Sequence, residues 1–228
     1  PNPLGGTKVF LRRSALIDVG GWDAHNVTED ADLGIRLARH GYQTEMLSST
    51  TYEEANNQIW PWVRQRSRWL KGYMMTYRVH MRSPKLLLQQ LGLRRFVGFQ
   101  IIFLASLSQF ILAPVLWSFW IIPFGLPHPI LPLLGPNAAQ AVISFFLTII
   151  GADIIISLFA LSKTRHRGLG RYTPTLWLYF HLGTLAAFKA AYEMIFDPYF
   201  WDKTAHGHSL ETRKTTAMRP LVSQSSIE

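Results

Sequence analysis

Three acids stand within four positions of a chain whose formal net charge is +9: Glu29, Asp30 and Asp32. Apolar residues at helical spacing follow them as far as Gly41, so we expect a helix that begins at the acids. A carboxylate in a first turn is stabilised by free backbone N–H groups and by the helix dipole. Asp30 could therefore be a general base that accepts the proton of an attacking hydroxyl. Ordinary first-turn acids have the same pattern, and the local sequence alone favours that simpler interpretation.

The same acids spell Asp-x-Asp, which suggests a metal site. Side chains two positions apart on a helix point about 200° from each other, so Asp30 and Asp32 cannot chelate one ion. We expect Asp32 to pair instead with Arg36, four positions later. The sequence therefore predicts no metal ligand in this chain.

A second group of residues that could bind a substrate consists of Gln65, Arg68 and Trp69. Spacings of three and four place all three on one side of a helix. An amide, a guanidinium and an indole match a sugar hydroxyl, a phosphate and the flat face of a pyranose ring. An amphipathic helix at a membrane surface also places Arg and Trp at the level of the lipid headgroups. The residue types alone do not decide between these two interpretations.

A third group lies near the C-terminus, in residues 199–209. A loop there could bring Lys, Thr and backbone amides to a diphosphate. A solvated tail explains the same residues and is favoured locally, and the His-Gly-His pair offers too few ligands for zinc. The residues concerned are Trp201, Lys203, Thr204, His206 and Gly207.

Secondary-structure elements must position these three groups of residues. The first elements lie in residues 1–56, whose sequence resembles part of a soluble α/β domain. Residues 7–13 and 42–47 are strand candidates. Between them, residues 14–22 read as a short helix that ends at a Gly-Gly turn. We therefore expect an α/β fragment at this end of the chain.

The helix that begins at the acids has two candidate N-caps, Asn26 and Thr28. Asn26 and Glu29 have the spacing of a capping box, in which each side chain bonds the other's backbone. Gly41 is a natural stop.

Residues 57–82 predict a second helix, with Pro61 in its first turn. Aromatic and cationic side chains alternate along it, which is typical of a helix lying among lipid headgroups. We therefore assign residues 57–95 to an interfacial helical region.

Residues 96–161 contain two apolar stretches, 97–124 and 138–161, each long enough to cross a bilayer. The loop between them carries no Lys or Arg, whereas the segment after the second stretch is strongly basic. Because cytoplasmic loops are enriched in these residues, we expect residues 1–95 and 162–172 to be cytoplasmic. Asp153, inside the second stretch, could face a glycan path or cap a neighbouring helix.

Residues 162–200 combine a basic loop with a third apolar stretch, 173–196, whose course is ambiguous. It contains Lys189 and Glu193, and the tail that follows is basic. A third crossing would place that tail outside, against the charge rule. We favour an interfacial or re-entrant helix and a cytoplasmic tail, residues 201–228.

Composition excludes several classes of function. Without cysteine, the chain has no disulfide framework, thiolate metal site or cysteine nucleophile. Its basic residues flank apolar stretches, which indicates a membrane surface with anionic lipids rather than nucleic acid. The chain opens without a recognisable leader, and we interpret it as the C-terminal portion of a longer protein.

The order of these motifs is more specific than any one of them. Thr-Glu-Asp at 28–30, Q-x-x-R-W at 65–69, two apolar spans and WDKTAHG at 201–207 follow one another along the chain. This order resembles the membrane-embedded family 2 glycosyltransferases, the relatives of cellulose synthase, hyaluronan synthase and chitin synthase. The resemblance extends from Gly5, Gly6 and Thr7, a possible acceptor-side loop, to Gly207.

The resemblance implies roles for individual residues. Asp30 would be the general base, with Thr28 and Glu29 completing its motif. Gln65, Arg68 and Trp69 would line the acceptor end and the diphosphate. WDKTAHG looks like the loop that family members fold over the nucleotide, although Lys203 and His206 depart from the usual pattern.

The resemblance also implies what the rest of the protein supplies. The family's nucleotide-binding strand and metal-binding Asp-x-Asp lie upstream of the Thr-Glu-Asp motif, so this chain would be the C-terminal part of a GT-A-like domain, inactive alone, followed by interfacial and transmembrane helices. Mg²⁺ or Mn²⁺ would be held by ligands outside this chain. The implied reaction is inverting transfer from a nucleotide-sugar, with a UDP-sugar as the expected donor, to a growing β-linked polysaccharide at the cytoplasmic membrane. The alternatives are transfer to a lipid-linked acceptor and a catalytically silent membrane anchor.

Overall fold

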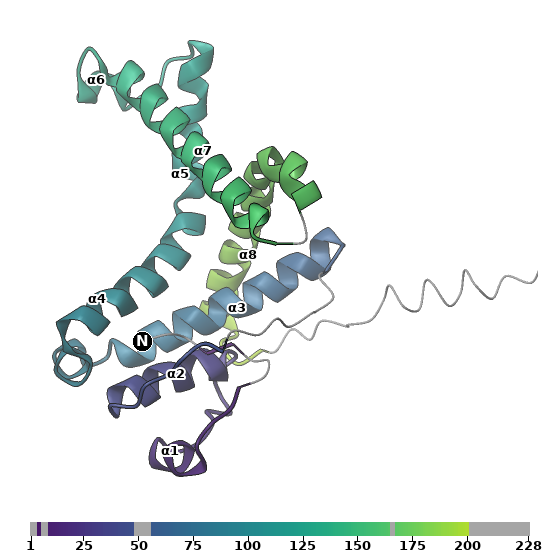
Figure 1. The fold of residues 1–228 in the computed structure, drawn as a ribbon. Helices are drawn as coiled ribbons and strands as arrows, with labels where there is room; N and C mark the ends of the chain where they lie inside the picture. The colour runs from purple at the N-terminus through teal and green to yellow at the C-terminus, as the bar shows by residue number, and fades with distance from the viewer. Residues whose placement is uncertain (1–3, 6–8, 48–55, 165–166, 201–228) are drawn as a thin grey trace, which may run out of the picture.

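The computed structural model describes residues 4–5, 9–47, 56–164 and 167–200. Within these ranges all regular structure is helical, and the helices cross at several angles rather than forming one parallel bundle (Figure 1). The elements are α1 (Arg13–Asp18), α2 (Glu29–Arg39), α3 (Ile59–His80), α4 (Pro84–Ile111), α5 (Ala113–Ser118), the 3₁₀ helix η1 (Phe119–Phe124), α6 (Leu131–Leu134), α7 (Ala138–Ser162), the 3₁₀ helix η2 (Arg167–Thr175) and α8 (Leu176–Phe196).

The expectation of an α/β fragment at the N-terminal end is wrong. In the described residues, neither 9–12 nor 42–47 forms a strand, and no sheet is present. Strand-like composition is not sufficient, because a strand exists only through hydrogen bonds to a neighbouring strand. Neither segment has such a neighbour in the described part of the chain.

The expected N-terminal helices are confirmed. α1 ends before Gly20 and Gly21, whose backbone φ angles are +82° and +76°, and α2 ends before Gly41, whose φ is +85°. Only glycine adopts such angles without strain, which explains why both helices stop there. The two helices share a small apolar core, formed by Ala15, Val19, Leu33 and Leu37.

The long helix α3 is the centre of the described fold, and α8 packs along it more extensively than any other pair of helices pack together. Small side chains permit this close approach, because Ala186, Ala187 and Ala190 of α8 are fully buried. They meet a set of larger side chains from α3 and α4: Trp62, Val63, Leu70 and Leu107. The predicted helix at 57–82 is thus confirmed, with Pro61 in its first turn.

A second core joins α2, α3 and α4. Phe99 and Phe103 of α4 are fully buried, and their rings pack against each other at a tilt of 37°, with centroids 4.7 Å apart. Ile35 of α2 packs into the same cluster. This core packs the second half of α2, at Ile35 and Ala38, against α4 and the partly buried side chains of α3.

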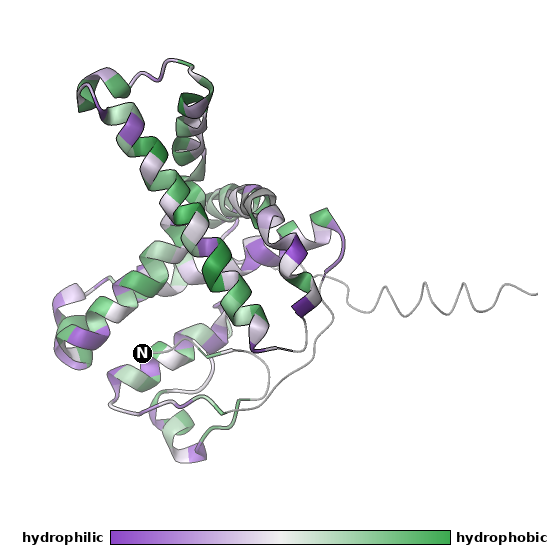
Figure 2. Ribbon diagram, turned by 45° about the horizontal axis from the view of Figure 1, so that its top comes forward, coloured by the Kyte–Doolittle hydropathy of each residue, from purple (hydrophilic) through white to green (hydrophobic). Residues whose placement is uncertain are grey.

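Two helices are long and apolar enough to cross a membrane, α4 and α7, among the residues that the structure describes. α7 matches the predicted second span, and its most apolar stretch is not buried against the rest of the molecule. Figure 2 shows apolar residues following one another along this helix.

The first predicted span, 97–124, is not one helix. α4 begins earlier, bends at Gly92, where φ is +71°, and ends at Ile111. α5 and η1 then continue the path as short separate helices. Pro114 and Pro123 explain the interruptions, because proline has no N–H group and its ring clashes with the preceding turn.

Candidate active site

The start of α2 meets the middle of α3 at Gly72. A Cβ atom placed on Gly72 would lie 2.3 Å from the Oγ1 atom and 2.4 Å from the Cγ2 atom of Thr28. Contacts this short do not occur between real side chains, so only glycine lets the two segments touch. Thr28 itself is buried. The Thr-Glu-Asp motif is therefore seated directly on the helix that carries Q-x-x-R-W.

Asn26 forms the second tie between these segments. Its Nδ2 donates a hydrogen bond to Oγ1 of Thr76 at 2.9 Å, and its Oδ1 accepts one from the backbone N–H of Thr28 at 3.0 Å. The predicted capping box with Glu29 is wrong: Thr28 occupies the N-cap position, and no side chain caps the helix. The Asn26 amide is used for tertiary contact instead.

Asp30 lies in the first turn of α2 and is half-buried. Its Oδ1 accepts a hydrogen bond from the backbone N–H of Ala31 at 2.8 Å, which fixes the orientation of the carboxylate. Burial raises the pKa of Tyr73 on α3, and the negative charge of Asp30 raises it further.

Gln65, Arg68 and Trp69 all belong to α3, which is helical without interruption from Ile59 to His80. Helical spacing therefore places them on one side, and Tyr73 follows Trp69 by one turn on the same side. Gln65 and Arg68 are half-buried, whereas Trp69 is 40% exposed. Gly72, which Thr28 contacts, lies three positions after Trp69 and four after Arg68, so the Thr-Glu-Asp segment meets this side of α3.

Arg66 holds the indole of Trp69. The guanidinium carbon of Arg66 lies 4.5 Å from the Trp69 ring centroid and 5.3 Å from that of Trp62. Such cation–π contacts contribute about 0.5–1 kcal/mol at exposed sites. Trp69 is consequently a partly exposed aromatic surface whose ring is held in place.

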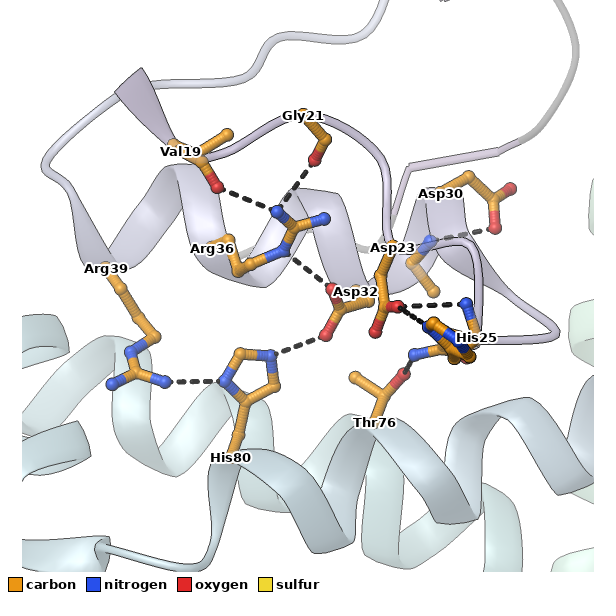
Figure 3. A network of polar contacts seen from close by, with 12 residues as sticks. Val19, Gly21, Asp23, His25, Asp30, Asp32, Arg36, Arg39, Thr76 and His80 are labelled. Carbon is orange, nitrogen blue, oxygen red and sulfur yellow. Dashed lines mark hydrogen bonds and ion pairs between the residues drawn. The ribbon is translucent and has the colours of Figure 1, made fainter. Parts of the chain in front are cut away.

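Asp32 turns away from Asp30 and joins a buried network (Figure 3). Its Oδ2 accepts a hydrogen bond from Nε of Arg36 at 2.7 Å, which confirms the predicted pair. Its Oδ1 lies 3.0 Å from Nε2 of His80. Arg39 lies 2.8 Å from the other ring nitrogen and can only donate, so His80 carries its proton on Nε2 and donates it to Asp32.

The network leaves Asp32 no capacity for a metal. Burial alone would raise the pKa of Asp32, but His80 and then Arg36 outweigh burial and lower the pKa below its usual value. In the described residues no group of three His, Asp or Glu side chains could hold a metal ion. The divalent cation that the sequence resemblance implies, with its ligands outside this chain, stays a prediction.

The remaining predicted residues are placed as follows. Glu29 is half-buried beside Asp30, and Gly5 is exposed. Gly6 and Thr7 lie outside the described residues, as do the five residues of the predicted diphosphate loop: Trp201, Lys203, Thr204, His206 and Gly207.

Sequence reasoning missed the residues that join the two motifs: Asn26 as a tertiary bridge, Gly72 and Thr76. One signal could have found Gly72. A glycine inside a strongly helical pattern is unfavourable relative to alanine by about 1 kcal/mol and usually has a packing reason. Nothing in the local sequence indicates that the partner is Thr28.

The family model described as glycosyl transferase family group 2 matches residues 1–190. Among curated proteins, the chain is 37% identical over 70 residues to the probable glycosyltransferase YdaM of Bacillus subtilis, covering 30% of this chain and 17% of that protein. It is 38% identical over 76 residues to a beta-monoglucosyldiacylglycerol synthase of Synechocystis, covering 32% and 16%.

A UDP-forming cellulose synthase catalytic subunit of Komagataeibacter sucrofermentans is 29% identical over 109 residues, covering 47% of this chain and 14% of that protein. The matched regions thus span less than a fifth of the length of each of these relatives. No solved structure matches the chain significantly.

Proposed function

This chain belongs to the glycosyl transferase family group 2, and on that premise we propose that its α2–α3 site activates the acceptor in an inverting sugar transfer. The donor is a nucleotide-sugar, most simply a UDP-sugar, and the acceptor is the end of a growing β-linked polysaccharide. The observation that carries the proposal is the contact of Thr28 with Gly72, which supports a single site made from both motifs.

In the proposed mechanism Asp30 accepts the proton of the acceptor hydroxyl. The oxygen then forms a bond to the anomeric carbon of the donor sugar while the bond from that carbon to the diphosphate breaks. The nucleoside diphosphate leaves with the electron pair. A single displacement of this kind inverts the anomeric centre, so an α-linked donor gives a β-linked product.

The Q-x-x-R-W residues bind and orient in this mechanism. The Arg68 guanidinium offsets the charge that develops on the departing diphosphate. The Trp69 ring, partly exposed and held by Arg66, offers a flat face to the terminal sugar of the acceptor. Gln65 donates or accepts a hydrogen bond at a sugar hydroxyl. Tyr73, whose pKa is raised, remains a phenol and can donate a hydrogen bond beside Asp30.

A membrane-bound enzyme accounts for the rest of the chain. α4 and α7 can cross a bilayer by length and composition. We propose that α2, α3 and the segment after α8 lie on the cytoplasmic side, where nucleotide-sugars are made, and that membrane lipids surround α4 and α7. Asp153 on α7 could face the path of the product.

The test is Asp30→Asn in the full-length protein in membranes, assayed with UDP-sugars. The amide cannot accept the hydroxyl proton, so we expect the transfer rate to fall by at least about 100-fold, as for loss of a general base. UDP binding should be unchanged, which shows that the variant is folded. Asp18→Asn, on the exposed end of α1, is the matched control and should retain activity. Near-normal transfer by Asp30→Asn would remove Asp30 from the mechanism.

A second candidate is transfer of one or a few sugars to a lipid, and the similarity to a beta-monoglucosyldiacylglycerol synthase favours it. The chemistry at Asp30 is the same for both acceptors. Sizing of the products of the wild-type protein separates them, because a polymerase gives long chains from a small amount of acceptor, whereas a lipid transferase gives short glycolipids that extract into organic solvent.

A further inference from the structure

Lys71 is a fully buried cation on α3 that the proposed mechanism does not use. Its Nζ donates hydrogen bonds to the carbonyl oxygens of Phe200, at 2.7 Å, and Asp197, at 3.2 Å. It also lies 3.6 Å from Oε2 of Glu193 on α8. An ammonium group has three N–H donors, and three acceptors surround this one.

A buried ammonium group destabilises the fold unless hydrogen bonds and a counter-charge compensate it. Removing a charge from water costs several kcal/mol, and only close partners offset that cost. Glu193 supplies the counter-charge, and it is shared with Lys189 one turn earlier on α8. The two carbonyl groups belong to the backbone that follows α8. Lys71 therefore joins α3 to the exact place where the chain leaves α8.

Lys71 lies on the part of α3 that also forms the candidate active site. Lys71 directly precedes Gly72, on which Thr28 rests, and it follows Trp69 by two positions. Two positions along a helix turn the side chain by about 200°, so Trp69 and Lys71 face different sides. One turn of α3 thus carries the acceptor-side aromatic ring and the anchor for residues 197–200.

We propose that Lys71 is a positioning residue for sugar transfer: it fixes the backbone at 197–200 relative to the acceptor side of α3. The inference rests on the proposed function. The chain continues from Phe200 into the residues that the sequence predicts to contact the diphosphate. Loss of the anchor should therefore raise the KM for the nucleotide-sugar more than it lowers kcat.

The anchor itself is tested by hydrogen exchange of the full-length protein. Two amides report on it: Asp197 N–H donates to the Glu193 carbonyl oxygen at 2.9 Å, and Phe200 N–H donates to the Asp197 carbonyl oxygen at 3.2 Å. In Lys71→Met we expect both to exchange at least about tenfold faster. Arg78→Met removes an exposed cation from the same helix and should change neither. Unchanged exchange in Lys71→Met would overturn the anchor.

The positioning role is tested by steady-state kinetics on the same proteins. We expect the KM for the UDP-sugar to rise at least about threefold in Lys71→Met, with a smaller change in kcat. Released amides with an unchanged KM would overturn the positioning role, because a purely structural residue would lower only the amount of active protein. If Lys71→Met does not fold, Glu193→Gln weakens the same anchor and is measured in its place.

These outcomes are separable from failure of the proposed function. If the wild-type protein transfers no sugar from any UDP-sugar, sugar transfer and the positioning role both fail. The hydrogen-exchange comparison would still decide whether Lys71 fixes residues 197–200.

Discussion

The carboxylate of Asp32 is 3% exposed and has a partner on each oxygen, Arg36 on one and His80 on the other. Arg36 also donates to the backbone carbonyls of Val19 and Gly21, at 2.8 and 2.7 Å. One acid therefore links the end of α1, the body of α2 and the C-terminal turn of α3. It stabilises the frame that holds Asp30 without taking part in the proposed chemistry.

Asp32→Asn should lower the free energy of unfolding at pH 7 by about 3 kcal/mol, because it removes a buried charge that compensates Arg36, whose side chain is only 20% exposed. Denaturant unfolding followed by Trp fluorescence measures this change. The carboxylate of Asp18 accepts a hydrogen bond from Tyr42 at an exposed site. Asp18→Asn should therefore lower the free energy of unfolding by less than about 1 kcal/mol. Equal effects of the two substitutions would contradict the role given to Asp32.

The pH dependence should follow from the lowered pKa of Asp32. A depressed folded-state pKa contributes stability that is complete above the unfolded value of about 3.9 and is lost as the pH falls through the folded value. The wild-type protein should therefore lose more stability than Asp32→Asn between about pH 4 and pH 2. Parallel unfolding curves across that range would show that Asp32 contributes nothing.

Local sequence rules predicted some residue contacts and missed others. The Asp32–Arg36 pair was predictable because both residues lie on one helix, four positions apart. His80 and Thr76 are 48 and 50 positions from their partners, Asp32 and Asn26, and no local rule relates residues at such separations. Asn26 and Thr28 were both candidate N-caps of α2; Thr28 takes that position, and the Asn26 side chain bonds Thr76 on α3 instead.

At the scale of elements, α2 and α3 approach each other closely only because Gly72 has no side chain. Gly72→Ala should displace Thr28, since the new Cβ atom would meet two of its side-chain atoms. We expect a loss of stability of about 1–3 kcal/mol from overpacking and a clear loss of transfer activity. Thermal unfolding and the sugar-transfer assay measure the two effects.

Gly98→Ala provides the matched control within α4. Nothing lies within 4 Å of a Cβ atom placed there, so this substitution should be neutral or slightly stabilising through helix propensity. If Gly72→Ala behaved like Gly98→Ala in both measurements, the proposed contact between the two motifs would be wrong.

The helices could be predicted because their apolar periodicity, glycine stops and prolines are all local signals. α2, α3 and α7 match their expected ranges within a few residues. In the parts that the structure describes, 9–13 and 42–47, the expected strands do not form, because composition alone cannot supply a neighbouring strand. The single span predicted at 97–124 is interrupted between α4 and α5, because Pro114 breaks the apolar run.

At the scale of the whole molecule, the proposed topology places the α5–α7 connection outside the cytoplasm and the α7–η2 connection inside. Residues 1–228 contain no cysteine, so a single cysteine introduced here has no competing thiol within this chain. In intact cells, a cysteine at Leu133, which is 82% exposed, should react with a membrane-impermeant thiol reagent. A cysteine at Lys163, just after α7, should be protected until the cells are opened. The reverse pattern would overturn the topology.

The sequence indicated the order of large parts, from the Thr-Glu-Asp helix through the Q-x-x-R-W helix to the apolar helices. It could not predict that α8 pairs with α3, because that arrangement depends on small residues at 186–190 meeting a partner more than a hundred positions earlier.

The same separation affects how the protein is made. The carbonyl groups that enclose Lys71 lie 126 and 129 positions later in the chain. At about 5–20 residues per second, a ribosome needs roughly 6–25 seconds to reach them after adding Lys71. Throughout that interval the ammonium group must remain hydrated. The nascent helix α3 therefore cannot complete its packing around Lys71 until the ribosome has synthesised both apolar helices, α4 and α7.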